Sequence, residues 1–111
     1  MAYDEVLADR IRAVLATDHD VVEKKMFGGL AFLIGGNMSV SASGQGGLLL
    51  RCDPEETESL VKNPHADRFE MRGRAMDGWL RIESEGVESD ADLRRWVDVG
   101  VAYAHTLPPK S

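Results

Sequence analysis

The chain has 111 residues, of which 43% are hydrophobic, and a formal net charge of −6. This length and composition suit one domain with its own core, and a single cysteine, Cys52, excludes an internal disulfide and a paired-cysteine zinc framework. No apolar run approaches the roughly 20 residues that a membrane span needs, and the first residues do not resemble a secretory leader. The negative charge opposes sequence-independent attraction to nucleic acid or anionic lipid. We therefore expect a cytoplasmic protein without a membrane segment.

Residues 3–16 carry an apolar stripe at helical spacing, formed by Leu7, Ile11, Val14 and Leu15, which predicts an amphipathic helix. Residues 17–20 interrupt this stripe with side chains that favour turns. The second half of residues 21–27 is predicted to form the first strand.

Two pairs of glycines punctuate the next segment. Gly28-Gly29 is predicted to end or bulge the first strand, because glycine in a strand pattern usually marks a bulge or a close backbone approach. Gly35-Gly36 lies between two apolar runs and predicts a tight hairpin turn. In residues 38–43, apolar side chains alternate with serines, which predicts one apolar and one solvated face.

The middle of the chain predicts a connection, a strand and a short helix. Residues 44–47 could be mistaken for a phosphate-binding loop, but a strand rather than a helix is predicted to follow them. That strand contains three consecutive leucines at 48–50, which indicates burial on both faces. Asp53 and Glu56 then form a predicted capping box around Pro54, for a helix running to about Lys62.

The last third predicts two strands and a long helix. Residues 68–72 alternate as a strand with Phe69 and Met71 inward, residues 73–78 are predicted to form a loop ending in Asp-Gly, and residues 79–83 the partner strand. Ser89 is a predicted helix cap, and an apolar stripe follows from Leu93 to Ala104.

The predicted order of elements is α-β-β-β-β-α-β-β-α. Strands joined by hairpins favour an antiparallel sheet, here of five to six strands, with the helices packed on one side. We therefore predict a two-layer α+β fold that forms a single domain over residues 1–111. No alternation of strands and helices supports a Rossmann-type parallel sheet.

Three stretches resemble the N-terminal domain of the TfoX/Sxy family. They are the Met-Phe-Gly-Gly strand at 25–32, the leucine-rich strand entering a helix at 48–53, and the Met-Asp-Gly-Trp segment within 73–79. Their order and spacing match the family over roughly residues 3 to 106.

The resemblance implies a regulatory function. TfoX/Sxy proteins are regulators of natural competence that act with a cyclic-AMP receptor protein at promoters, and their full-length form carries a second, C-terminal helical domain. We expect this chain to correspond to the N-terminal domain alone, as a non-enzymatic module whose partner is a protein such as a transcription regulator. The family supplies no catalytic residues, and we predict no catalytic site, resident metal or cofactor.

The first candidate binding site surrounds the first glycine pair, where backbone without side chains permits close approach of a partner. The structural alternative is that the glycines serve only a bulge and helix packing. The residues are Lys24, Lys25, Phe27, Gly28 and Gly29.

The second candidate surface is basic, and it supports the alternative of nucleic-acid binding. Between residues 62 and 81, five Lys and Arg against three Asp and Glu give a local charge of +2. Self-neutralisation, for example by Glu70, is the simpler interpretation, whereas binding of a phosphate or an acidic partner is the functional one. The arginines are Arg68, Arg72, Arg74 and Arg81.

A third hypothesis is a small enzyme or metal-binding protein. The segments 18–20 and 65–67 both contain histidine and aspartate, although neither has a strong metal-ligand spacing. Cys52 is expected to be a buried small side chain rather than a reactive thiol. A homodimer formed through a sheet edge or the last helix is a further expectation.

Overall fold

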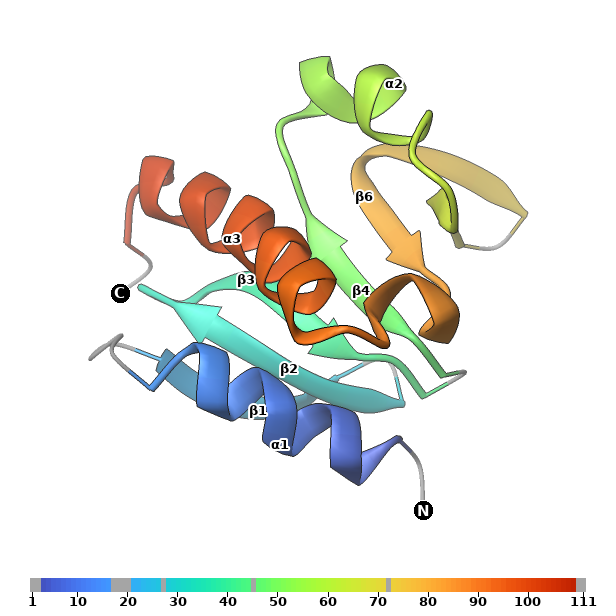
Figure 1. The fold of residues 1–111 in the computed structure, drawn as a ribbon. Helices are drawn as coiled ribbons and strands as arrows, with labels where there is room; N and C mark the ends of the chain where they lie inside the picture. The colour runs from blue at the N-terminus through green and yellow to red at the C-terminus, as the bar shows by residue number, and fades with distance from the viewer. Residues whose placement is uncertain (1–2, 17–20, 27, 45, 72, 110–111) are drawn as a thin grey trace.

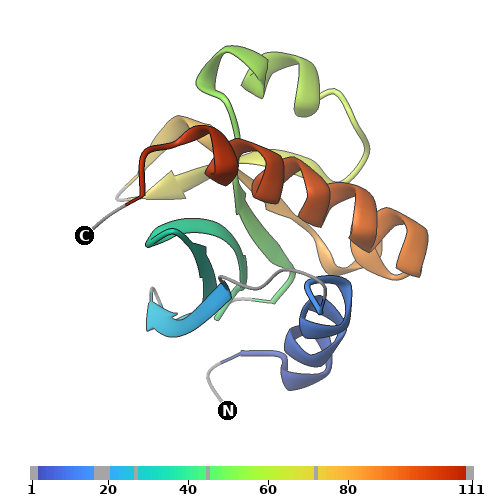
Figure 2. The same cartoon turned by 90° about the vertical axis from the view of Figure 1, so that its left-hand side faces the viewer.

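An antiparallel sheet of six strands lies at the centre of the described residues, with the strand order β1-β2-β3-β4-β6-β5. The computed structural model describes residues 3–16, 21–26, 28–44, 46–71 and 73–109. The strands are β1 (Val21–Met26), β2 (Gly29–Ile34), β3 (Asn37–Ala42), β4 (Leu48–Arg51), β5 (Ala66–Met71) and β6 (Arg74–Ile82). Figure 2 shows that β2 and β3 are strongly curved.

Two helices, α1 (Glu5–Val14) and α3 (Asp90–Thr106), cover one face of this sheet (Figure 1). A 3-10 turn, η1 (Pro54–Glu56), and the four-residue helix α2 (Thr57–Leu60) connect β4 to β5, and a second 3-10 turn, η2 (Ser84–Val87), precedes α3. The predicted two-layer α+β fold and its element order are confirmed. No helix in the described part of the chain combines the length and the hydropathy needed to cross a bilayer.

The main core lies between the sheet and these two helices. Ile11 of α1 and Trp96 of α3 belong to the same buried cluster as Phe32, Leu50 and Leu80 of the sheet. The leucine triplet of β4 is buried on both faces, as predicted, because Leu48 and Leu50 enter this core while Leu49 faces the opposite side. Burial of these side chains from water is the main stabilising contribution to the fold.

Side-chain caps fix where the helices begin. The carboxylate of Asp4 accepts a hydrogen bond from the backbone N–H of Leu7 at 3.1 Å, and the hydroxyl of Ser89 accepts one from Asp92 at 3.1 Å. Asp53 caps in the same way, accepting from Glu55 at 2.9 Å. The predicted caps at Ser89 and Asp53 are therefore confirmed, but the helix expected to reach Lys62 is shorter and is divided into η1 and α2.

The prediction of a solvated serine face on β3 is wrong, because Ser39 and Ser41 are almost fully buried. Phe32 pairs with Val40 but Leu33 pairs with Met38, so Ser39 is the extra residue of a β-bulge. The bulge moves Met38 to the face away from the helices, where it packs with Leu49 in a second apolar cluster. Ser39 satisfies its hydroxyl by donating to the carbonyl oxygen of Phe32 at 2.8 Å.

The prediction of a loop over residues 73–78 is also wrong, because β6 begins at Arg74 and includes the rest of this segment. Arg68 pairs with Leu80 but Phe69 pairs with Met76, which leaves Asp77-Gly78-Trp79 as extra residues on β6. The Asp-Gly signal therefore marks an irregularity within a strand, with Gly78 at φ +87°, and not a hairpin turn. The first strand likewise differs from its prediction, because it begins at Val21.

Candidate functional site

The first predicted binding surface lies on β1, at one edge of the sheet. Lys24 and Lys25 are exposed on this outer strand, and Gly28 lies in the connection to β2 with φ +75°. Phe27 lies outside the described residues. Exposed lysines on an edge strand also hinder pairing with a further strand.

Gly29 has a clear structural role. A Cβ atom at this position would lie 2.1 Å from the carbonyl oxygen of Ala42, so a side chain cannot fit where β2 meets the end of β3. The close approach expected for a glycine in a strand pattern is therefore confirmed at Gly29, where it lies within the sheet, between β2 and the end of β3. At Gly28, by contrast, no heavy atom lies within 4 Å of the position of a Cβ, and its positive φ is the constraint.

The predicted arginines do not share one strand face. Arg68 pairs across the sheet with Leu80, which faces the helices, whereas Arg81 pairs with Leu49, which faces away from them. Arg68 donates to Asp77 at 2.8 Å, and Arg81 donates to the carbonyl oxygen of Gly46 at 3.0 Å. Arg74 is exposed at the start of β6. Arg72 lies outside the described residues.

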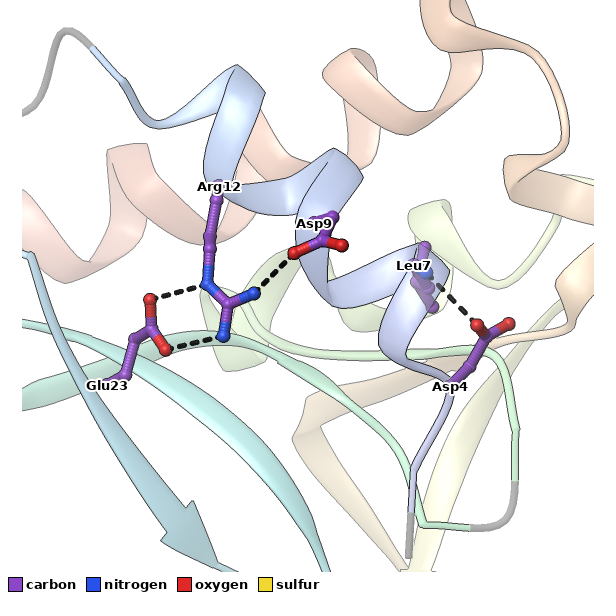
Figure 3. A network of polar contacts seen from close by, with 5 residues as sticks. All are labelled: Asp4, Leu7, Asp9, Arg12 and Glu23. Atoms are coloured by element: carbon purple, nitrogen blue, oxygen red, sulfur yellow. Dashed lines mark hydrogen bonds and ion pairs between the residues drawn. The ribbon is translucent and has the colours of Figure 1, made fainter. Parts of the chain in front are cut away.

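A polar network ties β1 to α1 (Figure 3). Arg12 of α1 donates from Nε and Nη2 to the two carboxylate oxygens of Glu23 on β1, at 2.7 and 2.8 Å, and it also pairs with Asp9. This bidentate geometry is the favourable one for arginine and carboxylate. The hydrogen bonds from Arg12 lower the pKa of Glu23, and those to Glu23 raise the pKa of Arg12. The network anchors the edge strand and has the features of a structural contact.

A groove between η1–α2 and α3 offers a surface for docking another chain. It has a volume of about 560 Å³ and apolar sides formed by Leu60 of α2 with Val99 and Tyr103 of α3. Three carboxylates and one guanidinium also line it. These charged residues are Asp53, Glu56, Asp98 and Arg95.

Buried contacts hold the α2 side of this groove in place. The hydroxyl of Thr57, which is 1% exposed, accepts a hydrogen bond from the backbone N–H of Gly78 at 2.7 Å. Cys52 donates its backbone N–H to the carbonyl oxygen of Gly78 at 2.9 Å. The irregular part of β6 therefore positions η1 and α2 opposite α3.

Arg51 links the groove to the second apolar cluster. Its guanidinium carbon lies 5.4 Å from the ring centre of Trp79 and 5.6 Å from that of Tyr103, within cation–π range of both. Trp79 in turn packs against the second cluster. This arrangement orients Tyr103, which lines the groove on α3.

Cys52 is buried, as predicted. Burial raises the pKa of its thiol, against a weaker opposing effect of a contact between its sulfur and the Thr57 hydroxyl at 3.8 Å. A raised pKa disfavours the reactive thiolate.

One of the two histidine segments considered for metal binding has acidic neighbours. The Nδ1 atom of His65 lies 3.2 Å from a carboxylate oxygen of Glu83 and 3.8 Å from one of Glu85. Asp67, the expected neighbour in sequence, is not in this cluster. Residues 18–20, the other segment, lie outside the described residues.

Sequence patterns did not reveal the groove or the acidic neighbours of His65. Both features combine side chains that are far apart in the sequence, such as Leu60 with Tyr103 and His65 with Glu83. The only available signal was charge: residues 83–98 carry six acidic side chains against two basic ones. A charge excess does not tell which residues will meet.

The model of a known protein family matches most of this chain. The model of the TfoX N-terminal domain matches residues 13–104, which includes the whole sheet and most of α3. No curated protein matches the chain. The three stretches that resemble the family lie within β1–β2, in β4 and the start of η1, and in β6, and all fall inside the matched range. The chain belongs to the TfoX N-terminal domain family.

Proposed function

We propose that this protein is a non-enzymatic regulatory module that acts by binding protein partners, in transcriptional or competence-type regulation. Family membership supports the regulatory part of this proposal. The groove between η1–α2 and α3 is the single observation that carries the part concerning protein partners.

The groove favours an amphipathic helix as its occupant. Its walls are helical on both sides, and Leu60, Val99 and Tyr103 offer half-buried apolar surface between them. Helix-in-groove recognition uses apolar side chains at i, i+3 or i+4, and i+7 against such a surface. The apolar contacts would provide most of the affinity.

Charge favours a helix with basic residues on its polar side. Asp53, Glu56 and Asp98 place three carboxylates along the groove. Arg95 is the lining cation, and its guanidinium lies 5.1 Å from the ring centre of Trp96 and 4.0 Å from a carboxylate oxygen of Asp92. A partner bearing Lys or Arg would complement this surface, which increases association rate and specificity.

Nucleic-acid binding is less well supported by the positions of the arginines. Arg68 already pairs with Asp77, and the guanidinium of Arg81 already donates a hydrogen bond to the carbonyl oxygen of Gly46. The formal charge of −6 also opposes approach of a polyanion.

A defined probe tests the proposal. A fluorescent peptide of about five helical turns (~18 residues), with leucines on one face and lysines on the other, is titrated into the purified chain and followed by anisotropy. We expect saturable binding, which weakens several-fold in the double variant Glu56→Gln and Asp98→Asn. Glu58→Gln is the matched control, because Glu58 lies on α2 but does not line the groove. A peptide with glutamates in place of the lysines should bind poorly.

The same variants then test the biological partner. Affinity capture from native cell extract should recover a protein with the wild-type chain and with Glu58→Gln, but much less of it with the double variant. Equal peptide binding by all the variants would overturn the groove as the docking site. Turnover of a small substrate, abolished by one polar substitution in a folded chain, would overturn the proposal that the module is non-enzymatic.

A further inference from the structure

We propose that His65, Glu83 and Glu85 form a surface site for a divalent transition-metal ion of the Zn²⁺ type. This site is separate from the groove and does not depend on the function proposed above. An imidazole nitrogen and two carboxylate oxygens, one from each residue, all lie within 4.8 Å of one another. Among the described residues, no other group of three or more histidine, cysteine, aspartate and glutamate side chains meets this criterion.

The spacing of the ligand atoms fits a tetrahedral ion. Zinc binds imidazole nitrogen and carboxylate oxygen at about 2.0–2.2 Å, so two ligands of a tetrahedral site lie about 3.4 Å apart. The Nδ1 atom of His65 lies 3.2 Å from Oε2 of Glu83 and 3.8 Å from Oε2 of Glu85. Both carboxylates converge on the same nitrogen, so an ion would need only small side-chain movements to bind all three groups.

The chemistry of the three groups selects among ions. Imidazole is a good ligand for Zn²⁺, Co²⁺ and Ni²⁺, whereas Mg²⁺ and Ca²⁺ prefer oxygen ligands. A set of one nitrogen and two oxygens therefore favours the transition metals. Three protein ligands leave a fourth position for water or for a group from another molecule.

The backbone holds these side chains together in the absence of an ion. The N–H of Glu83 donates to the carbonyl oxygen of His65 at 2.9 Å, and the N–H of Gly86 donates to that of Glu83 at 2.8 Å. A Cβ atom at Gly86 would lie only 2.8 Å from the Cβ atom of His65, so Gly86 packs closely against His65. The turn before β5 and the 3-10 turn η2 are thus fixed relative to one another, which reduces the ordering that metal binding requires.

The site is accessible to an ion from solution. The side chains of His65, Glu83 and Glu85 are 40%, 48% and 70% exposed. Such exposure lets an ion enter and leave quickly, and it leaves part of the coordination sphere to water. Because the ion and a proton compete for the same imidazole nitrogen, binding should weaken as the pH falls.

The test uses the purified full chain without an affinity tag, titrated with ZnCl₂ and separately with MgCl₂ by isothermal calorimetry at pH 7.5. We expect one Zn²⁺ per chain and no comparable heat with Mg²⁺. His65→Asn should weaken Zn²⁺ binding at least tenfold, as should Glu83→Gln. Asparagine is chosen because His65 has φ +68°, a conformation that asparagine tolerates better than most residues.

Matched controls separate this site from other ligands in the chain. The double variant His105→Asn and Glu88→Gln changes an exposed histidine and an exposed carboxylate outside the cluster, and it should bind Zn²⁺ like the wild type. In Co²⁺-loaded chain, NMR signals should shift at His65, Glu83 and η2. Zinc binding that is unchanged in His65→Asn, or equal affinity for Mg²⁺ and Zn²⁺, would overturn the proposal. Absence of Zn²⁺ binding would show that His65 and Glu83 form only a hydrogen-bonded pair.

Discussion

Substitution of Gly100 by alanine tests how closely α3 lies against the sheet. Gly100 is buried within α3, and a Cβ atom there would lie 2.4 Å from the carbonyl oxygen of Ser39 and 2.8 Å from Cγ1 of Val40. The valine methyl can rotate away, but a backbone oxygen of β3 cannot. The helix would therefore have to move away from the strand, together with Trp96 and Val97, which α3 buries in the core.

Two opposing free energies decide the sign of the effect. Replacing glycine by alanine inside a helix normally stabilises it by about 1 kcal/mol, because alanine loses less backbone entropy on folding. Overfilling a packed core costs about 1–3 kcal/mol, and contact with a backbone atom at this distance favours the upper part of that range. We expect Gly100→Ala to lower the free energy of unfolding by about 1–2 kcal/mol, which corresponds to a fall in Tm of about 5–10 °C.

Urea denaturation followed by circular dichroism measures this change directly. Ala102→Gly is the control, because residue 102 is exposed in the same helix and reports the propensity effect alone. This control should lose about 1 kcal/mol. If Gly100→Ala instead raises the free energy of unfolding by as much as the control lowers it, α3 does not approach β3 as closely as the structure indicates. That result would refute the steric reasoning.

Three further predictions follow from individual contacts. The pKa of Glu23 is lowered in the folded state by its hydrogen bonds from Arg12, so this pair stabilises the fold above the ordinary glutamate value of 4.5 and loses its effect as the pH falls through the lowered value. Because both side chains are more than one third exposed, Glu23→Gln should reduce stability at pH 7 by only about 0.5 kcal/mol, with a smaller difference at pH 3 in urea titrations. Thr57→Val leaves the buried N–H of Gly78 without its acceptor and should cost about 1–3 kcal/mol, whereas Thr57→Ser, which keeps the hydroxyl, should cost less; equal losses would contradict this assignment. The Cys52 thiol, buried and with a raised pKa, should react with a thiol reagent at the rate of unfolding, and rapid labelling of the native chain would show that it is accessible.

Local sequence signals predicted the regular parts of the fold well. Gly35 and Gly36 both adopt positive φ, at 58° and 81°, in the hairpin that their pairing indicated. Ser89 caps the long helix, and the leucine triplet is buried on both faces. Each of these features depends on residues within one turn or one strand, and the sequence contains all the information that they need.

The candidate sites could not be predicted in the same way. Asp53 and Asp98 line one groove although 45 positions separate their numbers in the sequence. His65 meets Glu83 because β5 and β6 pair in one register, which a bulge sets. Since neither meeting follows from local periodicity, the sequence could name His65 as a possible ligand but not its partners.

The two places where strand alternation fails share a physical cause. Ser39 is the extra residue on β3, and its carbonyl oxygen is the atom that a Cβ at Gly100 of α3 would meet at 2.4 Å. Gly78 lies in the irregular part of β6, and its N–H binds Thr57 of α2. In both places a helix lies against the strand at the irregular residue, so the backbone there is positioned by the helix as well as by its neighbouring strands. A bulge lets the strand accept this contact without breaking the rest of its ladder. The alternation of side chains between the two faces of a strand therefore fails at two positions where a helix packs against the sheet. One of these positions, Gly78, also holds the α2 side of the groove proposed to bind a partner.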